Sequence, residues 1–102
     1  MKLIIKDFEI ELKYTLRALF IFESISKKTF AINTITDLYL FFYSVILSNN
    51  PNIELTFDDL INECDVDTSI FSSFKKWFDS EMEKQTLLSD TTDTDKKKQK
   101  RK

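Results

Sequence analysis

The run of residues 38–47 constrains this chain more than any other stretch. All ten residues are apolar or aromatic except Ser44. Thr36 is the predicted cap of a helix here, and Asp37 favours its positive N-terminal end. The segment 49–51, Asn-Asn-Pro, ends the helix because proline cannot continue it. The helix, residues 36–47, is too short to span a bilayer, which needs about 20 apolar residues.

This predicted helix has two apolar faces. One carries Leu38, Phe41, Phe42 and Val45, and another carries Leu40, Tyr43 and Leu47. A helix that is apolar on all sides is either buried on all sides or offers its spare face to a partner.

The N-terminal residues predict a β-hairpin. Residues 2–5 are mostly apolar, and residues 8–14 alternate between apolar and polar with a period of two. Lys6 and Asp7 between them form the predicted two-residue turn. The apolar side of the second strand, with Phe8, Ile10, Leu12 and Tyr14, must lie on the helices, since a lone hairpin is only marginally stable in water.

Three further helices are predicted, over residues 16–26, 56–65 and 69–82. Thr15 caps the first, Thr56 the second, and Asp67 or Thr68 the third. The first has two apolar stripes, one with Leu16, Leu19 and Phe20 beside Glu23, the other with Ala18, Ile21, Phe22 and Ile25. We therefore expect a single α+β domain over residues 1–84, with an N-terminal hairpin packed on about four helices.

Residue types that are absent or scarce exclude several kinds of site. The 102 residues contain no glycine, no histidine and one cysteine, Cys64. A glycine-rich phosphate loop, a histidine-based triad and an internal disulfide are thereby excluded. Five carboxylates crowd one region (Asp58, Asp59, Glu63, Asp65 and Asp67), but the glycine and the closing Glu of a calcium loop are missing. We therefore expect that the protein is not an enzyme and that it binds no metal and no cofactor.

The charge of the chain is unevenly distributed. Its net charge is −2, yet residues 85–102 hold six basic and three acidic residues. Residues 1–84 therefore carry a net negative charge, which argues against a domain that binds nucleic acid through its main surface. We predict a disordered basic tail over residues 85–102. Its basic side chains are candidate contacts for nucleic acid or an acidic partner: Lys96, Lys97, Lys98, Lys100, Arg101 and Lys102.

Two segments together carry a resemblance to a known family. The first is the hairpin leading into Leu-Lys-Tyr-Thr-Leu-Arg-Ala-Leu at residues 12–19, then Phe-Glu-Ser-Ile-Ser-Lys-Lys-Thr-Phe at residues 22–30. The second is Thr-Asp-Leu at 36–38 with Tyr-Ser at 43–44, followed by Leu-Thr-Phe-Asp-Asp-Leu at 55–60. Over residues 1–84 the chain resembles small tail assembly chaperones of long-tailed bacteriophages. It departs at Lys27, where that family usually has glycine.

The resemblance implies a protein of the host cytoplasm that keeps the phage tape-measure protein soluble and recruits tail-tube subunits. We expect the partner to lie in an apolar groove formed by Tyr39, Phe42, Tyr43 and Ile46, with Trp77 as an aromatic anchor. A longer frameshifted form, encoded through the lysine run at 96–98, is a further hypothesis. Two alternatives stay open: a small regulatory or nucleic-acid-associated protein acting through its basic tail, and a homo-oligomer that buries its apolar face on itself.

Overall fold

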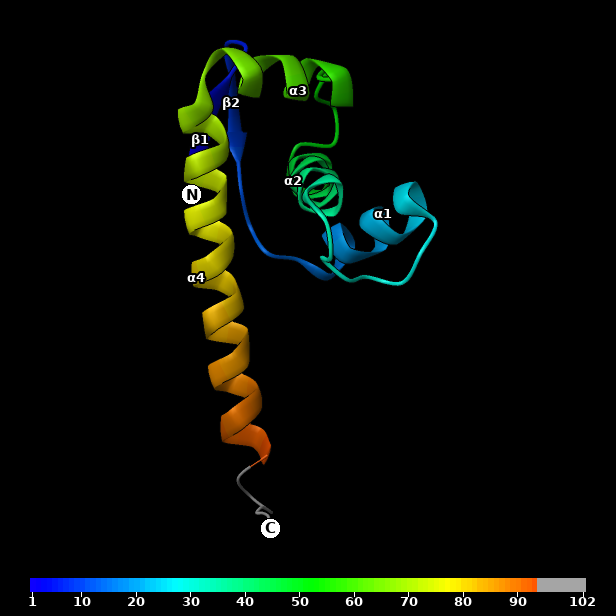
Figure 1. The fold of residues 1–102 in the computed structure, drawn as a ribbon, viewed down its shortest axis with the longest axis vertical. Coiled ribbons are helices and arrows are strands. Elements are labelled where there is room, and N and C mark those ends of the chain that lie inside the picture. Colours follow the sequence, from blue (N-terminus) through cyan, green and yellow to red (C-terminus); the bar gives the residue numbers. More distant parts are fainter. Residues whose placement is uncertain (94–102) are drawn as a thin grey trace.

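The computed structural model describes the backbone of residues 1–93 and the side chains of residues 1–84. Two strands, β1 (Lys2–Ile5) and β2 (Phe8–Glu11), precede four helices. These are α1 (Leu16–Ser26), α2 (Ile35–Asn49), α3 (Phe57–Val66) and α4 (Thr68–Asp93). The predicted α+β class, a hairpin on four helices, is confirmed (Figure 1).

The hairpin has the predicted two-residue turn. Lys6 and Asp7 both adopt positive φ, 51° and 69°, as a tight turn between antiparallel strands requires. Ile5 pairs with Phe8, and Lys2 pairs with Glu11. The second strand is shorter than the predicted 8–14 and ends at Glu11. Beyond it, the Leu12 N–H donates to the Met1 carbonyl at 2.7 Å, and the Leu12 carbonyl accepts from the Met1 amino group at 3.2 Å.

The apolar helix α2 lies at the centre of the fold. In Figure 1 it is seen end-on, with α1 on one side and α4 on the other. Its cap is Thr34, two residues before the predicted Thr36. Thr34 accepts a hydrogen bond from the Asp37 backbone N–H, and the Asp37 carboxylate accepts one in return from the Thr34 N–H. This reciprocal pair is a capping box, and it fixes where α2 begins.

The apolar core surrounds α2. The first predicted face is buried as expected, and the second is partly buried against neighbouring elements. Phe42 stacks on Phe74 of α4 with ring centroids 4.1 Å apart. Phe41 meets Phe22 of α1 and Phe78 of α4 edge-on. One helix thus holds α1 and α4 together.

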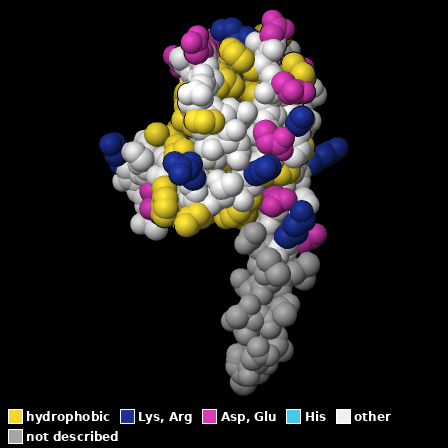
Figure 2. All heavy atoms as spheres, turned by 180° about the vertical axis from the view of Figure 1, so that it is seen from behind, with side chains coloured by type: hydrophobic (Ala, Val, Ile, Leu, Met, Phe, Trp, Pro, Cys, Tyr) yellow, Lys and Arg dark blue, Asp and Glu magenta, His cyan; other side chains and the backbone are white. Residues whose placement is uncertain are grey.

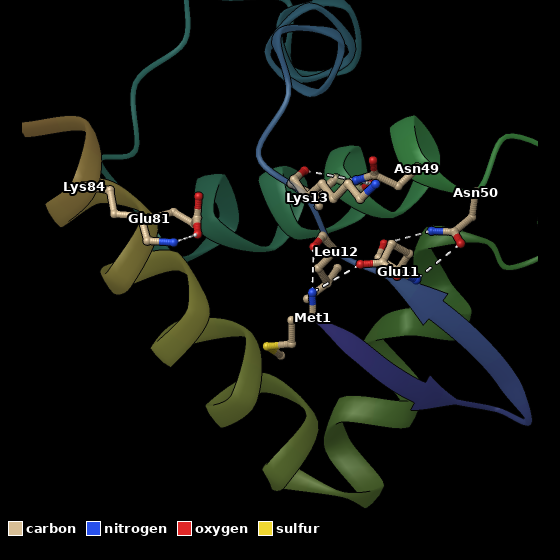
Figure 3. A network of polar contacts seen from close by, with 9 residues as sticks. Met1, Glu11, Leu12, Lys13, Asn49, Asn50, Glu81 and Lys84 are labelled. Atoms are coloured by element: carbon tan, nitrogen blue, oxygen red, sulfur yellow. Dashed lines mark hydrogen bonds and ion pairs between the residues drawn. The ribbon is translucent and has the colours of Figure 1, made fainter. Parts of the chain in front are cut away.

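The end of α2 is tied to the hairpin by two asparagines (Figure 3). The Asn50 carboxamide accepts from the Glu11 backbone N–H at 3.3 Å and donates to the Glu11 carbonyl at 3.1 Å. The Asn49 amide donates to the Lys13 carbonyl at 3.0 Å. These bonds satisfy backbone groups where β2 leaves the sheet, so they set the position of the hairpin against the helices.

The other helices mostly begin at the caps that the sequence predicts, although α4 ends later than predicted. Thr15 caps α1 by accepting from the Ala18 N–H, and Thr56 caps α3. Asp67 precedes α4 and accepts from the Ser69 N–H at 3.0 Å. α4 continues to Asp93, past the predicted end at Met82. The predicted disordered tail, residues 85–102, has no described side chains, and residues 94–102 lie wholly outside the described part of the chain.

Candidate partner-binding surface

Two residues of the predicted groove are core residues. Phe42 and Ile46 have no exposed surface. Phe42 lies flat against Phe74, with ring planes only 9° apart. Placing these two side chains in a surface groove is therefore wrong for this structure, because α4 covers the face of α2 on which Phe42 lies.

The two tyrosines of the predicted groove are partly buried at the edges of α2. Tyr39 stacks on Phe71 of α4 at 4.4 Å between ring centroids. The Tyr43 hydroxyl donates to the Leu55 carbonyl at 2.8 Å, and its ring meets Phe57 edge-on. Burial raises the pKa of both phenols, and nearby acidic groups raise it further. Both side chains already hold α2 against α3 and α4.

Trp77, the predicted anchor, lies on the outer side of α4 beside the chain start. It is partly exposed, and its ring also packs on Phe74 at 5.8 Å. It lines an open hollow of about 550 Å³ whose other walls are mainly polar: Met1, Ser73, Lys76, Ser80, Glu81 and Lys84. Figure 3 shows Lys84 pairing with Glu81 near this site. Neither Tyr39 nor Tyr43 lines this hollow, and Trp77 is connected to Tyr39 only through Phe74 and Phe71 of α4.

The exposed apolar surface lies on the outer face of α1, whereas the sequence analysis predicted it on α2. Leu16 is 64% exposed and Phe20 is 61% exposed, one helical turn apart. They line an open hollow of about 460 Å³ together with Arg17, Ile21 and Ser24. Figure 2 shows apolar side chains gathered at the lower left of the body, the side on which α1 lies in that view. We call these five residues the α1 outer face.

The position of this face follows from the packing of α1. Ala18 and Phe22 on the opposite side are fully buried against the core, and Phe22 meets Phe30 and Phe41. Among the described elements, α1 packs chiefly on α2. With one main neighbour, α1 leaves Leu16 and Phe20 of the first stripe largely exposed, whereas Leu19 of the same stripe packs against the core. The two stripes were visible in the sequence, but the number of neighbours was not.

The other apolar side chains that are more than half exposed are scattered. Ile4, Ile35 and Val66 are 65%, 67% and 85% exposed and lie on β1, at the start of α2 and at the end of α3. None of them lines the hollow beside α1. Single exposed apolar residues are ordinary on protein surfaces, whereas a pair beside a hollow marks a candidate contact site.

Two of the groups that could carry chemistry, Cys64 and Asp59, are buried or already bonded to neighbours. Cys64 is buried, and burial together with Asp65 raises the pKa of its thiol to about 11, so the thiol stays protonated at neutral pH. Asp59 is engaged by the Thr56 N–H and by Lys6. Within residues 1–84, no three acidic or cysteine side chains converge as metal ligands would.

The remaining predicted contacts lie at the C-terminal end. The six basic candidates from Lys96 to Lys102 are outside the described residues, so their role stays a prediction. Of the helices described, none combines the length and the apolar content needed to cross a membrane.

Comparisons with protein-family models, with curated proteins and with solved structures find no match to this chain.

Proposed function

We propose that this domain is a protein-binding module whose α1 outer face holds an apolar helix of a partner. The observation that carries the proposal is the exposure of Leu16 and Phe20 side by side on a well-packed helix. Exposing such side chains costs free energy in water, and covering them with a partner recovers it. The surface suits binding, since it combines a hollow with apolar side chains and contains no reactive group.

We further propose that the partner is the phage tape-measure protein and that the domain is a tail assembly chaperone of the host cytoplasm. Two points support this. The resemblance places the segment Leu-Arg-Ala-Leu at residues 16–19, and that segment includes two residues of the α1 outer face. A chaperone for a long helical protein also needs an accessible apolar face without catalytic chemistry, and helix-in-groove recognition is a common way to supply it. Tail-tube subunits remain a second proposed partner.

Co-expression tests the proposal. The chain is produced with the largest helix-rich protein encoded nearby, and the soluble fraction is analysed by size-exclusion chromatography with light scattering. We expect co-elution, and we expect Phe20→Asp to abolish it because the substitution removes the apolar side chain and places a charge on the face that the partner would cover. Val66→Asp is the matched control, since it changes an even more exposed side chain on α3.

Both variants are first checked by circular dichroism and thermal unfolding, which should match the unsubstituted chain. If the neighbour never becomes soluble, the chaperone proposal is refuted. If Phe20→Asp still co-elutes as the unsubstituted chain does, the partner binds elsewhere and the α1 outer face is not the site.

A further inference from the structure

The α1 outer face contains one charge among apolar walls. Arg17 is the only charged residue of the five that line the hollow. Among the residues with described side chains, no carboxylate lies within ion-pair distance of its guanidinium. Lys28 and Lys75, by contrast, are paired with Asp37 and Asp79. The cation beside the hollow is therefore available to a partner.

The size of this face indicates what kind of partner covers it. Two strongly exposed side chains and a half-buried Ile21 amount to a few hundred Å² at most, on the order of one or two aromatic side chains. A stable dimer of globular domains buries about 800 Å² on each side. The face is too small for that alone, but it suits the anchors of one crossing helix.

The shape of the face agrees with a crossing helix. Leu16, Phe20 and Ser24 follow one another at intervals of four residues, so they form one ridge along α1. The ridge ends in the small Ser24, which lets another backbone approach closely at that end. Arg17 borders the ridge near its N-terminal end, beside Leu16 and Phe20.

Arg17 sets the place on this face where a partner's negative charge is favoured. Glu23 lies six residues beyond Arg17, about 9 Å further along the helix axis, and its carboxylate is already bound by the Phe30 N–H at 2.8 Å. The helix dipole favours an anion at the N-terminal end of α1, where Arg17 lies. At the C-terminal end, the charge of Glu23 is offset by the nearby lysine Lys27. A partner carboxylate is expected beside Arg17.

We infer that the α1 outer face selects amphipathic helices that place one carboxylate next to their apolar anchors, with Arg17 as the specificity-determining residue. This inference rests on the proposed function and adds a requirement to it. A guanidinium presents two parallel N–H donors that match the two oxygens of a carboxylate. When the apolar side of a partner helix covers the face, water is excluded from the pair and the attraction is strengthened.

The test uses three synthetic 18-residue amphipathic helices with the same leucine face. They differ at one position beside that face, which is Glu, Gln or Lys, and fluorescence anisotropy reports their binding to the full chain. We expect the Glu peptide to bind about tenfold more tightly than the Lys peptide, the ratio that a charge-assisted hydrogen bond supports. Arg17→Glu should reverse this order, and the matched charge reversal Lys76→Glu on α4 should leave it unchanged.

The outcomes separate the two proposals. If Phe20→Asp abolishes binding of all three peptides while the unsubstituted chain does not distinguish among them, the inference about Arg17 is overturned and the proposed face stands. If Phe20→Asp binds the peptides as the unsubstituted chain does, the proposed face itself fails. A dimer that Phe20→Asp dissociates, with no peptide binding, would show that a second copy covers the face and would overturn the inference.

Discussion

At the scale of single residues, Asp37 connects more of the structure than its sequence position suggests. Its carboxylate is almost fully buried. It accepts from the backbone N–H groups of Asn33 and Thr34 and pairs with Lys28 at 2.7 Å. One side chain therefore caps α2 and also anchors the loop that returns from α1.

The pH dependence of stability tests this role. The Lys28 ammonium, and then the Asn33 N–H, lowers the pKa of Asp37 below its ordinary value. A carboxyl whose pKa is lowered by folding contributes stability above its unfolded pKa of about 3.9. That stability is lost as the pH falls through the folded pKa. We expect Asp37→Asn to lower the urea midpoint at pH 7, with the difference from the unsubstituted chain narrowing below about pH 4.

The control for this measurement is Glu9→Gln, which removes one negative charge from an exposed position of β2. Its midpoint should stay near that of the unsubstituted chain at both pH values. An Asp37→Asn difference that is the same at pH 7 and pH 3 would refute the ionic role of this carboxyl.

At the scale of elements, the end of α1 shows how a chain without glycine makes a left-handed turn. Lys27 follows Ser26 with φ 65° and ψ 28°, and its N–H donates to the Glu23 carbonyl at 3.0 Å. This conformation is strained for a residue with a side chain. The proteins that this sequence resembles usually have glycine at this position, and in the structure Lys27 adopts the conformation that glycine favours.

Lys27→Gly is therefore expected to stabilise the domain by about 0.5–1 kcal/mol, the relieved strain less the added freedom of the unfolded chain. Thermal unfolding should show a melting temperature raised by a few degrees. Thr29→Gly is the matched control, because Thr29 does not adopt positive φ and should gain nothing. An equal gain in both variants would show that the effect is not conformational.

At the scale of the whole molecule, the fold separates aromatic residues into a core set and a surface set. Phe42 is fully buried between α2 and α4, whereas Phe20 faces water on α1. We expect Phe42→Ala to cost about 3–5 kcal/mol, a large part of the stability of a small domain. Phe20→Ala should change stability by less than about 0.5 kcal/mol, as surface substitutions usually do.

Urea unfolding followed by circular dichroism measures both changes. Comparable destabilisation by the two substitutions would contradict the assignment of Phe20 to the surface. The contrast also explains why binding is tested at Phe20: a charge at Phe42 would unfold the domain before it could report on a partner.

The sequence by itself determined the elements of this protein and most of its helix caps. The hairpin with its turn at Lys6 and Asp7, the caps Thr15 and Thr56 and the buried face of the central helix depend on residue types and spacing within a few positions. Such local preferences are written in the chain itself. The sequence predicted Thr36 as the cap of α2, but the cap is Thr34. The two threonines are two residues apart, and only Thr34 exchanges hydrogen bonds with Asp37.

Only the tertiary structure decided which apolar face stays in water. Both α1 and α2 carry apolar residues on two sides, so neither sequence pattern reveals its exposed side. α2 contacts α1, α3 and β2, and its buried Phe42 stacks on α4, while α1 packs chiefly on α2. The number of neighbours around a helix depends on the path of the whole chain. For this reason Phe42 and Ile46 are buried in the core, and Leu16 and Phe20 form the candidate partner site.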